Sequence, residues 1–230
     1  MTRNTNARIA GATLLLYIAT GLSAMAIASS ITASQGPAAH LAAIAAEPWR
    51  IKVVVLLSLI MFVYAVVLGV TLYSLTRDHD RELATLGFLF RAGEGFLGMV
   101  GGMATLALLW LATSTAATSL NSDGLNAVAA VLARFDRTST TISAFAFALG
   151  SLAFSAVFLR SRSLPRWLAV VGVIASVLLV LVLPLRLVGW AAGPMTNAVW
   201  LPMLVFEVAL ALRLLVKGGA AVTVGQLAVS

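Results

Sequence analysis

The run of residues from Leu83 to Ala112 is long and apolar enough to cross a lipid bilayer, yet it contains Arg91 and Glu94. A helix that spans the hydrocarbon core needs about 20 residues at ~1.5 Å per residue. Entry near Leu83 therefore predicts that Arg91 lies roughly 12 Å deep and Glu94 roughly 16 Å deep, near the bilayer centre. Because a charge in hydrocarbon costs at least ~2.5 kcal/mol, both side chains must face other helices or a wet cavity.

The two charges belong to a stripe of small and polar residues on one face of the predicted helix. Residues three and four apart are neighbours on a helix surface, and this stripe consists of Gly87, Arg91, Glu94, Gly98, Gly102 and Thr105. We expect Gly87, Gly98 and Gly102 to let another helix approach closely. The G-x-G-x-x-G match from Gly93 to Gly98 carries no weight, because the dinucleotide fingerprint needs a preceding strand.

The composition of the whole chain indicates an integral membrane protein. Hydrophobic residues make up 61% of the 230 residues and charged residues only 10%, against about 25% charged in soluble domains. We therefore predict an all-α, polytopic bundle of about six transmembrane helices that forms a single domain over residues 1–230. The expected spans are residues 9–31, 53–75, 83–112, 141–159, 167–187 and 197–216.

The residue inventory excludes several classes of partner and cofactor. The formal net charge is +7, but the basic residues stand singly or in small groups at span ends, which indicates membrane topology rather than nucleic-acid binding. The chain has no Cys and only His40 and His79, both in predicted loops, so thiolate metal sites and haem ligation by paired histidines are excluded. Asp78, His79 and Asp80 suggest a metal site, although a solvated turn fits three consecutive loop residues better. We expect no cofactor.

The first span follows a short basic head that carries Arg3 and Arg8. A cleaved signal peptide is the alternative, because Ala24-Met25-Ala26 resembles a cleavage site. The apolar run is long for a signal peptide, which favours a span. A bundle helix is also favoured by a polar-to-small face, formed by Thr13, Tyr17, Thr20 and Ala24.

The connection from Ser114 to Thr138 contains a predicted amphipathic helix. Ser122 or Asp123 can cap its start, and apolar residues then recur at helical spacing, at Leu125, Val128, Leu132 and Phe135. We expect this short helix to lie on the membrane surface or to cap the bundle. A lid that gates a substrate or binds a partner is the alternative.

Basic residues are distributed unequally between the two sides of the membrane. With the N-terminus inside, the cytoplasmic segments carry nine Lys or Arg residues and the outer segments five. The positive-inside rule therefore places both termini in the cytoplasm. Trp167 then falls at the inner interface, and the other tryptophans fall at the outer one, at positions 49, 110, 190 and 200.

Glu207, in the last predicted span, is expected to complete a buried polar site. Counting back from Val216 places Glu207 roughly 13 Å from the inner end, level with Arg91. We therefore expect the third and sixth spans to be neighbours, with Arg91 between Glu94 and Glu207, and one of the two glutamates protonated at neutral pH. Tyr64, near the middle of the second span, could donate a hydrogen bond to these charges or to a backbone carbonyl.

Four stretches carry a resemblance to a known family. They are Ala7-Arg8-Ile9-Ala10-Gly11, Phe90-Arg91-Ala92-Gly93-Glu94, Leu164-Pro165-Arg166-Trp167-Leu168, and Glu207 followed by Leu214-Leu215-Val216-Lys217-Gly218. Together they resemble an uncharacterised family of bacterial six-span membrane proteins, the domain-of-unknown-function family four-three-eight-six. The resemblance covers nearly the whole chain. It implies a bacterial inner-membrane protein in which Arg91, Glu94 and Glu207 match the in-membrane polar positions, and it implies no activity.

The sequence leaves three functions open. The leading hypothesis is binding or transport of a small or amphiphilic molecule, a lipid or an ion at the polar site. An intramembrane enzyme that uses Glu94 and Glu207 for acid–base chemistry is the first alternative. The second is a homo-oligomer or a non-catalytic subunit of a membrane complex, and the buried charges could also serve only to fix the helix register.

Overall fold

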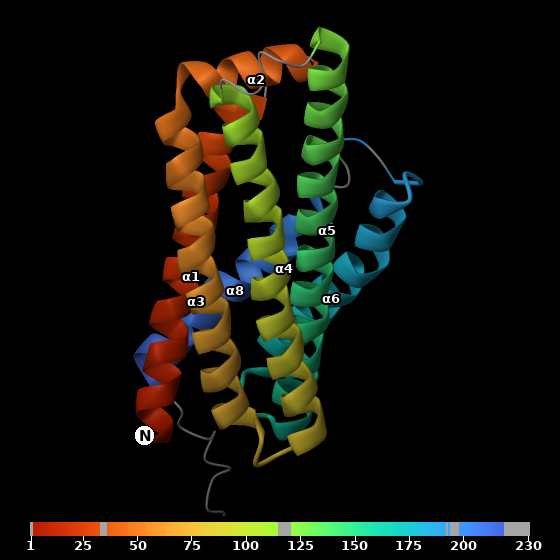
Figure 1. Ribbon diagram of the computed structural model, residues 1–230. Coiled ribbons are helices and arrows are strands. Elements are labelled where there is room, and N and C mark those ends of the chain that lie inside the picture. The colour runs from red at the N-terminus through yellow and green to blue at the C-terminus, as the bar shows by residue number, and fades with distance from the viewer. Residues whose placement is uncertain (1, 33–35, 115–120, 192, 194–197, 219–230) are drawn as a thin grey trace, which may run out of the picture.

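The computed structural model describes residues 2–32, 36–114, 121–191, 193 and 198–218 (Figure 1). Within these ranges the chain forms seven helices and no strand. The helices are α1 (Arg3–Thr32), α2 (Pro37–Ala46), α3 (Pro48–Thr76), α4 (Arg81–Thr113), α5 (Ser122–Ser161), α6 (Arg166–Leu187) and α8 (Trp200–Lys217).

Five of these helices, α1, α3, α4, α5 and α6, are long and apolar enough to cross a membrane. The described part of the chain is all-helical, and its five apolar helices give it the makeup of a multi-pass membrane protein. The sixth expected span corresponds to α8, which is 18 residues long and carries Glu207, Arg213 and Lys217. Because it carries these three charges, α8 does not belong to the five helices that are apolar enough to cross a membrane.

Two connections differ from the prediction. The loop expected between the first two spans contains the ten-residue helix α2, which starts with Pro37 in its first turn. The expected short helix between the third and fourth spans is not separate, because its residues belong to the N-terminal part of the 40-residue helix α5. No Gly or Pro interrupts the chain between Gly124 and Gly150, so nothing in the sequence breaks the helix where a boundary was expected.

The charged turn between α3 and α4 serves helix capping and packing. The side chain of Asp80 accepts a hydrogen bond of 3.0 Å from the backbone N–H of Leu83, which caps α4. Its other carboxylate oxygen lies 3.0 Å from a guanidinium nitrogen of Arg160 near the end of α5. The Asp80 carboxylate is thus occupied by structural contacts, and the described residues hold no cluster of three or more His, Asp or Glu side chains suited to a metal.

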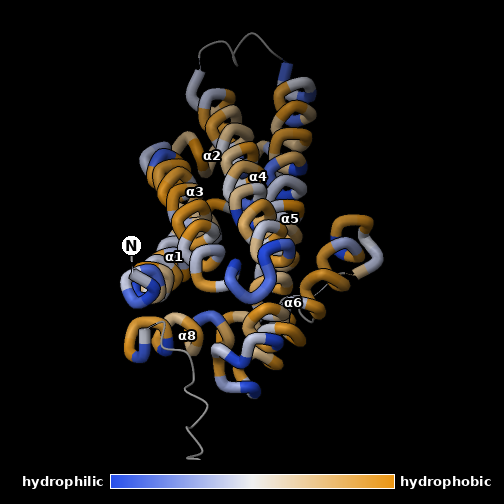
Figure 2. The backbone as a smooth tube through the Cα atoms, turned by 90° about the horizontal axis from the view of Figure 1, so that it is seen from below, coloured by the Kyte–Doolittle hydropathy of each residue, from blue (hydrophilic) through white to orange (hydrophobic). Residues whose placement is uncertain are grey.

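The helices form two layers (Figures 1 and 2). α4 packs against α3 and α5, while α8 packs against α1 and α6 on the other side of the bundle. α8 is strongly tilted relative to α4 in Figure 1, and across the described residues the two helices do not form one of the larger helix–helix contacts. The prediction that the third and sixth spans are direct neighbours is therefore wrong.

Two apolar cores hold the layers together. The larger core joins the two layers around residues such as Leu68, Phe154, Leu179 and Phe206. A smaller core lies under α2 and contains Ile31, Leu41, Ile44, Ile51, Leu108, Leu109 and Ala129. The exterior of the spans is also apolar, with large exposed side chains such as Leu56, Leu89 and Leu181, which is expected of a surface that contacts lipid.

Candidate functional site

Arg91 and Glu94 form an ion pair inside the bundle. They lie one turn apart on α4, where residues i and i+3 share a face, and a guanidinium nitrogen of Arg91 is 2.9 Å from Glu94 Oε2. Arg91 is 2% exposed and Glu94 is 3% exposed. A charge this deeply buried requires a partner, because its lost hydration is otherwise uncompensated.

Tyr17 on α1 is the third member of the site. Its hydroxyl donates a short hydrogen bond to Glu94 Oε1, so each carboxylate oxygen of Glu94 faces one partner. Sequence reasoning placed Tyr17 only on the packing face of the first span. The signal that could have found it is the periodic polar face that includes Thr13 and Thr20.

α5 closes the site over the guanidinium group. The ring of Phe147 has its centroid 4.8 Å from the Arg91 guanidinium carbon, and the Tyr17 ring lies at 5.3 Å. Both distances fall in the range of cation–π attraction. Gly150 makes this approach possible, because a Cβ atom there would lie 3.1 Å from Arg91 Cγ and 3.2 Å from the backbone oxygen of Gly87.

Glu207 approaches the same arginine from α8 across a small cavity. The cavity measures about 20 Å³, and its lining includes Arg91, Glu207, Ser151 and Ser155. This volume is enough for one water molecule. Glu207 is 8% exposed and has no ion pair within 4 Å among the described residues. Ser155 Oγ on α5 is also buried, and it has no hydrogen-bond partner among the described residues. We refer to Tyr17, Arg91, Glu94 and Glu207 as the polar cluster.

Tyr64 lies outside this cluster. It is partly exposed on α3, and no hydrogen bond joins it to the cluster in the described ranges. Its predicted depth was a poor guide, because depth along a helix does not fix the direction of a side chain. Tyr17 occupies the role that was considered for Tyr64.

The glycines of the predicted stripe are packed to different degrees. A Cβ atom at Gly87 would lie 2.9 Å from the Phe154 ring, so α4 and α5 meet closely there. Equivalent atoms at Gly98 and Gly102 would have their nearest neighbours at 3.7 Å and 3.9 Å, which are ordinary contacts. Close approach between α4 and α3 occurs instead at Gly95, where a Cβ atom would lie 2.9 Å from the Phe62 ring.

We expect Tyr17→Phe to lower the free energy of unfolding by about 1–2 kcal/mol, because it leaves a buried carboxylate oxygen without its donor. Tyr64→Phe is the matched control and should change stability by less than about 0.5 kcal/mol. Both variants can be measured by unfolding in mixed micelles followed by circular dichroism. Equal effects at the two tyrosines would contradict the assigned hydrogen bond.

A known protein family matches nearly the whole of the chain that the structure describes. The family described as domain of unknown function (DUF4386) matches residues 9–218. The chain belongs to this family. The DUF4386 match includes all four residues of the polar cluster, four of the five apolar helices in full and α1 from Ile9 onward. No curated protein and no solved structure matches the chain.

Proposed function

We propose that this DUF4386 member is a six-span protein of the bacterial inner membrane that binds or transports a small molecule or ion, with the polar cluster as its proton-binding element. The excess of basic residues at the ends of α3, α5, α6 and α8 that adjoin the N-terminus supports a cytoplasmic location for both termini. α8 would be the sixth span.

The observation that carries this proposal is the unequal partnering of two buried carboxylates. Glu94 faces both Arg91 and Tyr17, whereas Glu207 only shares a cavity with Arg91. With one guanidinium and two ionised carboxylates, the cluster would carry a surplus negative charge in a medium that penalises charge. Proton uptake by Glu207 would remove that surplus, and proton release would restore it.

The size of the cavity favours a proton over a larger species at the cluster itself. A space of about 20 Å³ admits a single water molecule, which could relay a proton between Glu207 and the buried serines. The same limit gives little support to an intramembrane enzyme, because a substrate could not reach both carboxylates without separation of the helices. Larger cargo would have to bind elsewhere and affect the cluster through helix movement.

The test is a comparison of Glu207→Gln with Glu82→Gln, which removes an exposed carboxylate at the start of α4. Infrared difference spectra of the reconstituted protein between acidic and alkaline buffer report the C=O stretch of buried protonated carboxyl groups. We expect a titrating band in the wild type and in Glu82→Gln that is absent in Glu207→Gln. A band that persists in Glu207→Gln would overturn the proposal.

A further inference from the structure

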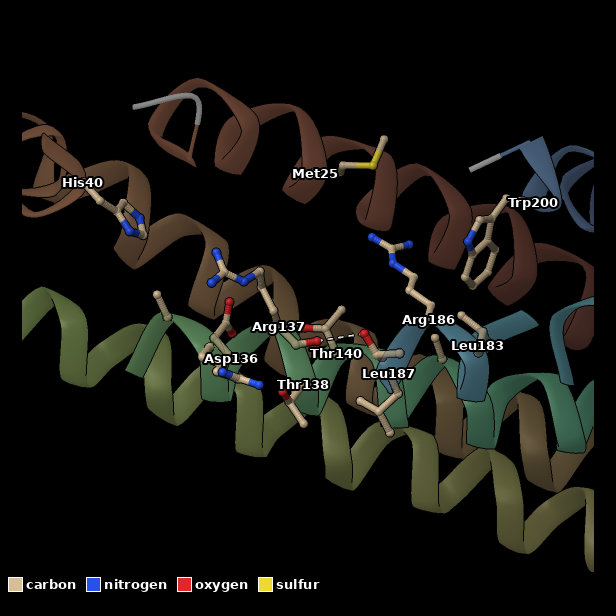
Figure 3. A pocket seen from close by; sticks show the side chains of 14 residues that line it. Met25, His40, Asp136, Arg137, Thr138, Thr140, Leu183, Arg186, Leu187 and Trp200 are labelled. Carbon is tan, nitrogen blue, oxygen red and sulfur yellow. Dashed lines mark hydrogen bonds between the residues drawn. The ribbon is translucent and has the colours of Figure 1, made fainter. Parts of the chain in front are cut away.

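A larger cleft lies at the end of the bundle remote from the polar turns at Arg160 and Arg166. There the C-terminal end of α6 diverges from α5 (Figure 1). The cleft has a volume of about 780 Å³, and its lining includes Met25, His40, Arg137, Thr140, Arg186 and Trp200 (Figure 3). We call it the outer cleft. Its volume is within the range of about 300–1,000 Å³ found for small-molecule sites.

The charges that line the outer cleft are predominantly positive. Arg134, Arg137 and Arg186 contribute three guanidinium groups, and Asp136 contributes one carboxylate. Within the described ranges, no ion pair neutralises any of the three arginines. The Asp136 carboxylate accepts a hydrogen bond of 3.1 Å from the Thr105 hydroxyl, so it is directed at least partly toward α4.

His40 adds no charge to this balance at neutral pH. Burial lowers the pKa of His40, and the positive charge of Arg137 lowers it further, against a smaller opposing effect of Asp136. The neutral imidazole can still donate or accept a hydrogen bond. The net positive charge of the cleft therefore comes from permanently charged arginines and favours an anionic ligand.

Two of these arginines lie about one bilayer thickness along their helices from the basic residues Arg160 and Arg166. Arg186 is in the last turn of α6, about 30 Å along the helix from Arg166 at its start. Arg137 on α5 is about 35 Å along its helix from Arg160 near the other end. Since the hydrocarbon core is about 30 Å thick, both guanidinium groups fall at the same membrane–water interface when Arg160 and Arg166 lie at the opposite one. Figure 3 shows both side chains directed toward the space beside α1.

The rest of the lining contains three threonines and several apolar side chains. Leu187 extends from α6 next to the buried Leu183, and Trp200 lies at the start of α8. Met25 on α1 is 64% exposed and Leu187 is 45% exposed. Aliphatic and aromatic side chains below a pair of arginines provide an apolar surface for an acyl chain whose charged end is at the interface.

We propose that the outer cleft binds an anionic phospholipid, with its headgroup phosphate between Arg137 and Arg186 and its acyl chain along the exposed side chains of Met25 and Leu187. Guanidinium groups bind phosphate through paired, charge-assisted hydrogen bonds, and the hydroxyl of Thr140 is available as a further donor. The ligand chemistry is thus an anionic phosphate joined to an apolar chain. This inference does not depend on the proton-binding role of the polar cluster.

The test uses the purified full-length protein in a neutral detergent, titrated with phosphatidylglycerol, phosphatidylcholine or inorganic phosphate and read by native mass spectrometry. The double variant Arg137→Gln/Arg186→Gln removes the proposed phosphate ligands. Arg8→Gln/Arg81→Gln removes the same charge from exposed positions at the opposite end of the bundle. Circular dichroism melts of both double variants establish that they are folded.

We expect the wild type to bind phosphatidylglycerol at least about tenfold more tightly than phosphatidylcholine. The Arg137/Arg186 variant should lose at least about tenfold in affinity for phosphatidylglycerol, as follows from the loss of two charge-assisted contacts, while the Arg8/Arg81 variant keeps the wild-type affinity. Equal binding of the two lipids, or wild-type affinity in the Arg137/Arg186 variant, would overturn the proposal. So would inorganic phosphate that binds as tightly as the lipid, because the site would then recognise a soluble anion. Glu207→Gln should still bind phosphatidylglycerol, which separates this result from the test of proton binding.

Discussion

Arg91→Met is expected to lower the free energy of unfolding by about 3–5 kcal/mol, the usual cost of removing one partner from a buried ion pair. The substitution leaves Glu94 buried with only the Tyr17 hydroxyl as a partner. It also removes the cation that faces Glu207 across the cavity. The measurement is unfolding by sodium dodecyl sulfate in mixed micelles, followed by the loss of helical circular dichroism.

A second substitution separates charge from packing at this position. In Arg91→Met/Glu94→Gln the buried carboxylate is neutral, and we expect most of the lost stability to return because apolar or neutral replacements of a whole buried pair are often tolerated. Arg81→Met, at an exposed position in the first turn of α4, is the control and should change stability by less than about 0.5 kcal/mol. If Arg91→Met unfolds at the same detergent fraction as Arg81→Met, the ion pair does not stabilise the bundle.

The spans could be predicted because their signal is local. A long apolar run needs no knowledge of its neighbours, and five of the six predicted runs lie within helices that are long and apolar enough to cross a membrane. Where the prediction failed, the signal was weaker. α2 is short and rich in Ala, and the start of α5 is polar enough to suggest a separate surface helix although the backbone continues unbroken.

The polar cluster was only partly predictable for a related reason. Arg91 and Glu94 are conspicuous in the sequence because charge in an apolar run is costly. Their partners depend on the lateral order of the helices, which depth along each span does not provide. The match in depth between Arg91 and Glu207 therefore suggested neighbouring helices, whereas α8 packs on α1 and α6 and reaches Arg91 only through the cavity. Tyr17 comes from a third helix.

The outer cleft and the polar cluster are linked through one aromatic side chain. Phe147 stacks against the Arg91 guanidinium group with the ring centroid at 4.8 Å. Its ring is also 6.0 Å from the ring of Trp200, which lines the cleft. A ligand that moved Trp200 would thus act on a neighbour of Arg91. The Phe147 ring thus connects the lining of the outer cleft with the polar cluster.

Gly11→Leu is expected to lower the free energy of unfolding by about 3 kcal/mol, at the upper end of the usual cost of overpacking. Gly11 is buried where α1 crosses α8. A Cβ atom there would lie only 2.6 Å from the backbone oxygen of Ala211 and 2.9 Å from Leu215 Cγ. Because a backbone oxygen cannot rotate away as a side chain can, the two helices must separate.

The matched control is Gly93→Leu on α4, where no atom lies within 4 Å of the added Cβ. Replacing a helical glycine at an open position should stabilise the helix by about 0.5–1 kcal/mol. The difference between the two variants measures the close contact of α1 with α8. Because α1 carries Tyr17 and α8 carries Glu207, separation at Gly11 should also remove the titrating carboxyl band assigned to Glu207. A Gly11→Leu protein with wild-type stability and an unchanged band would show that the polar cluster does not require this helix crossing.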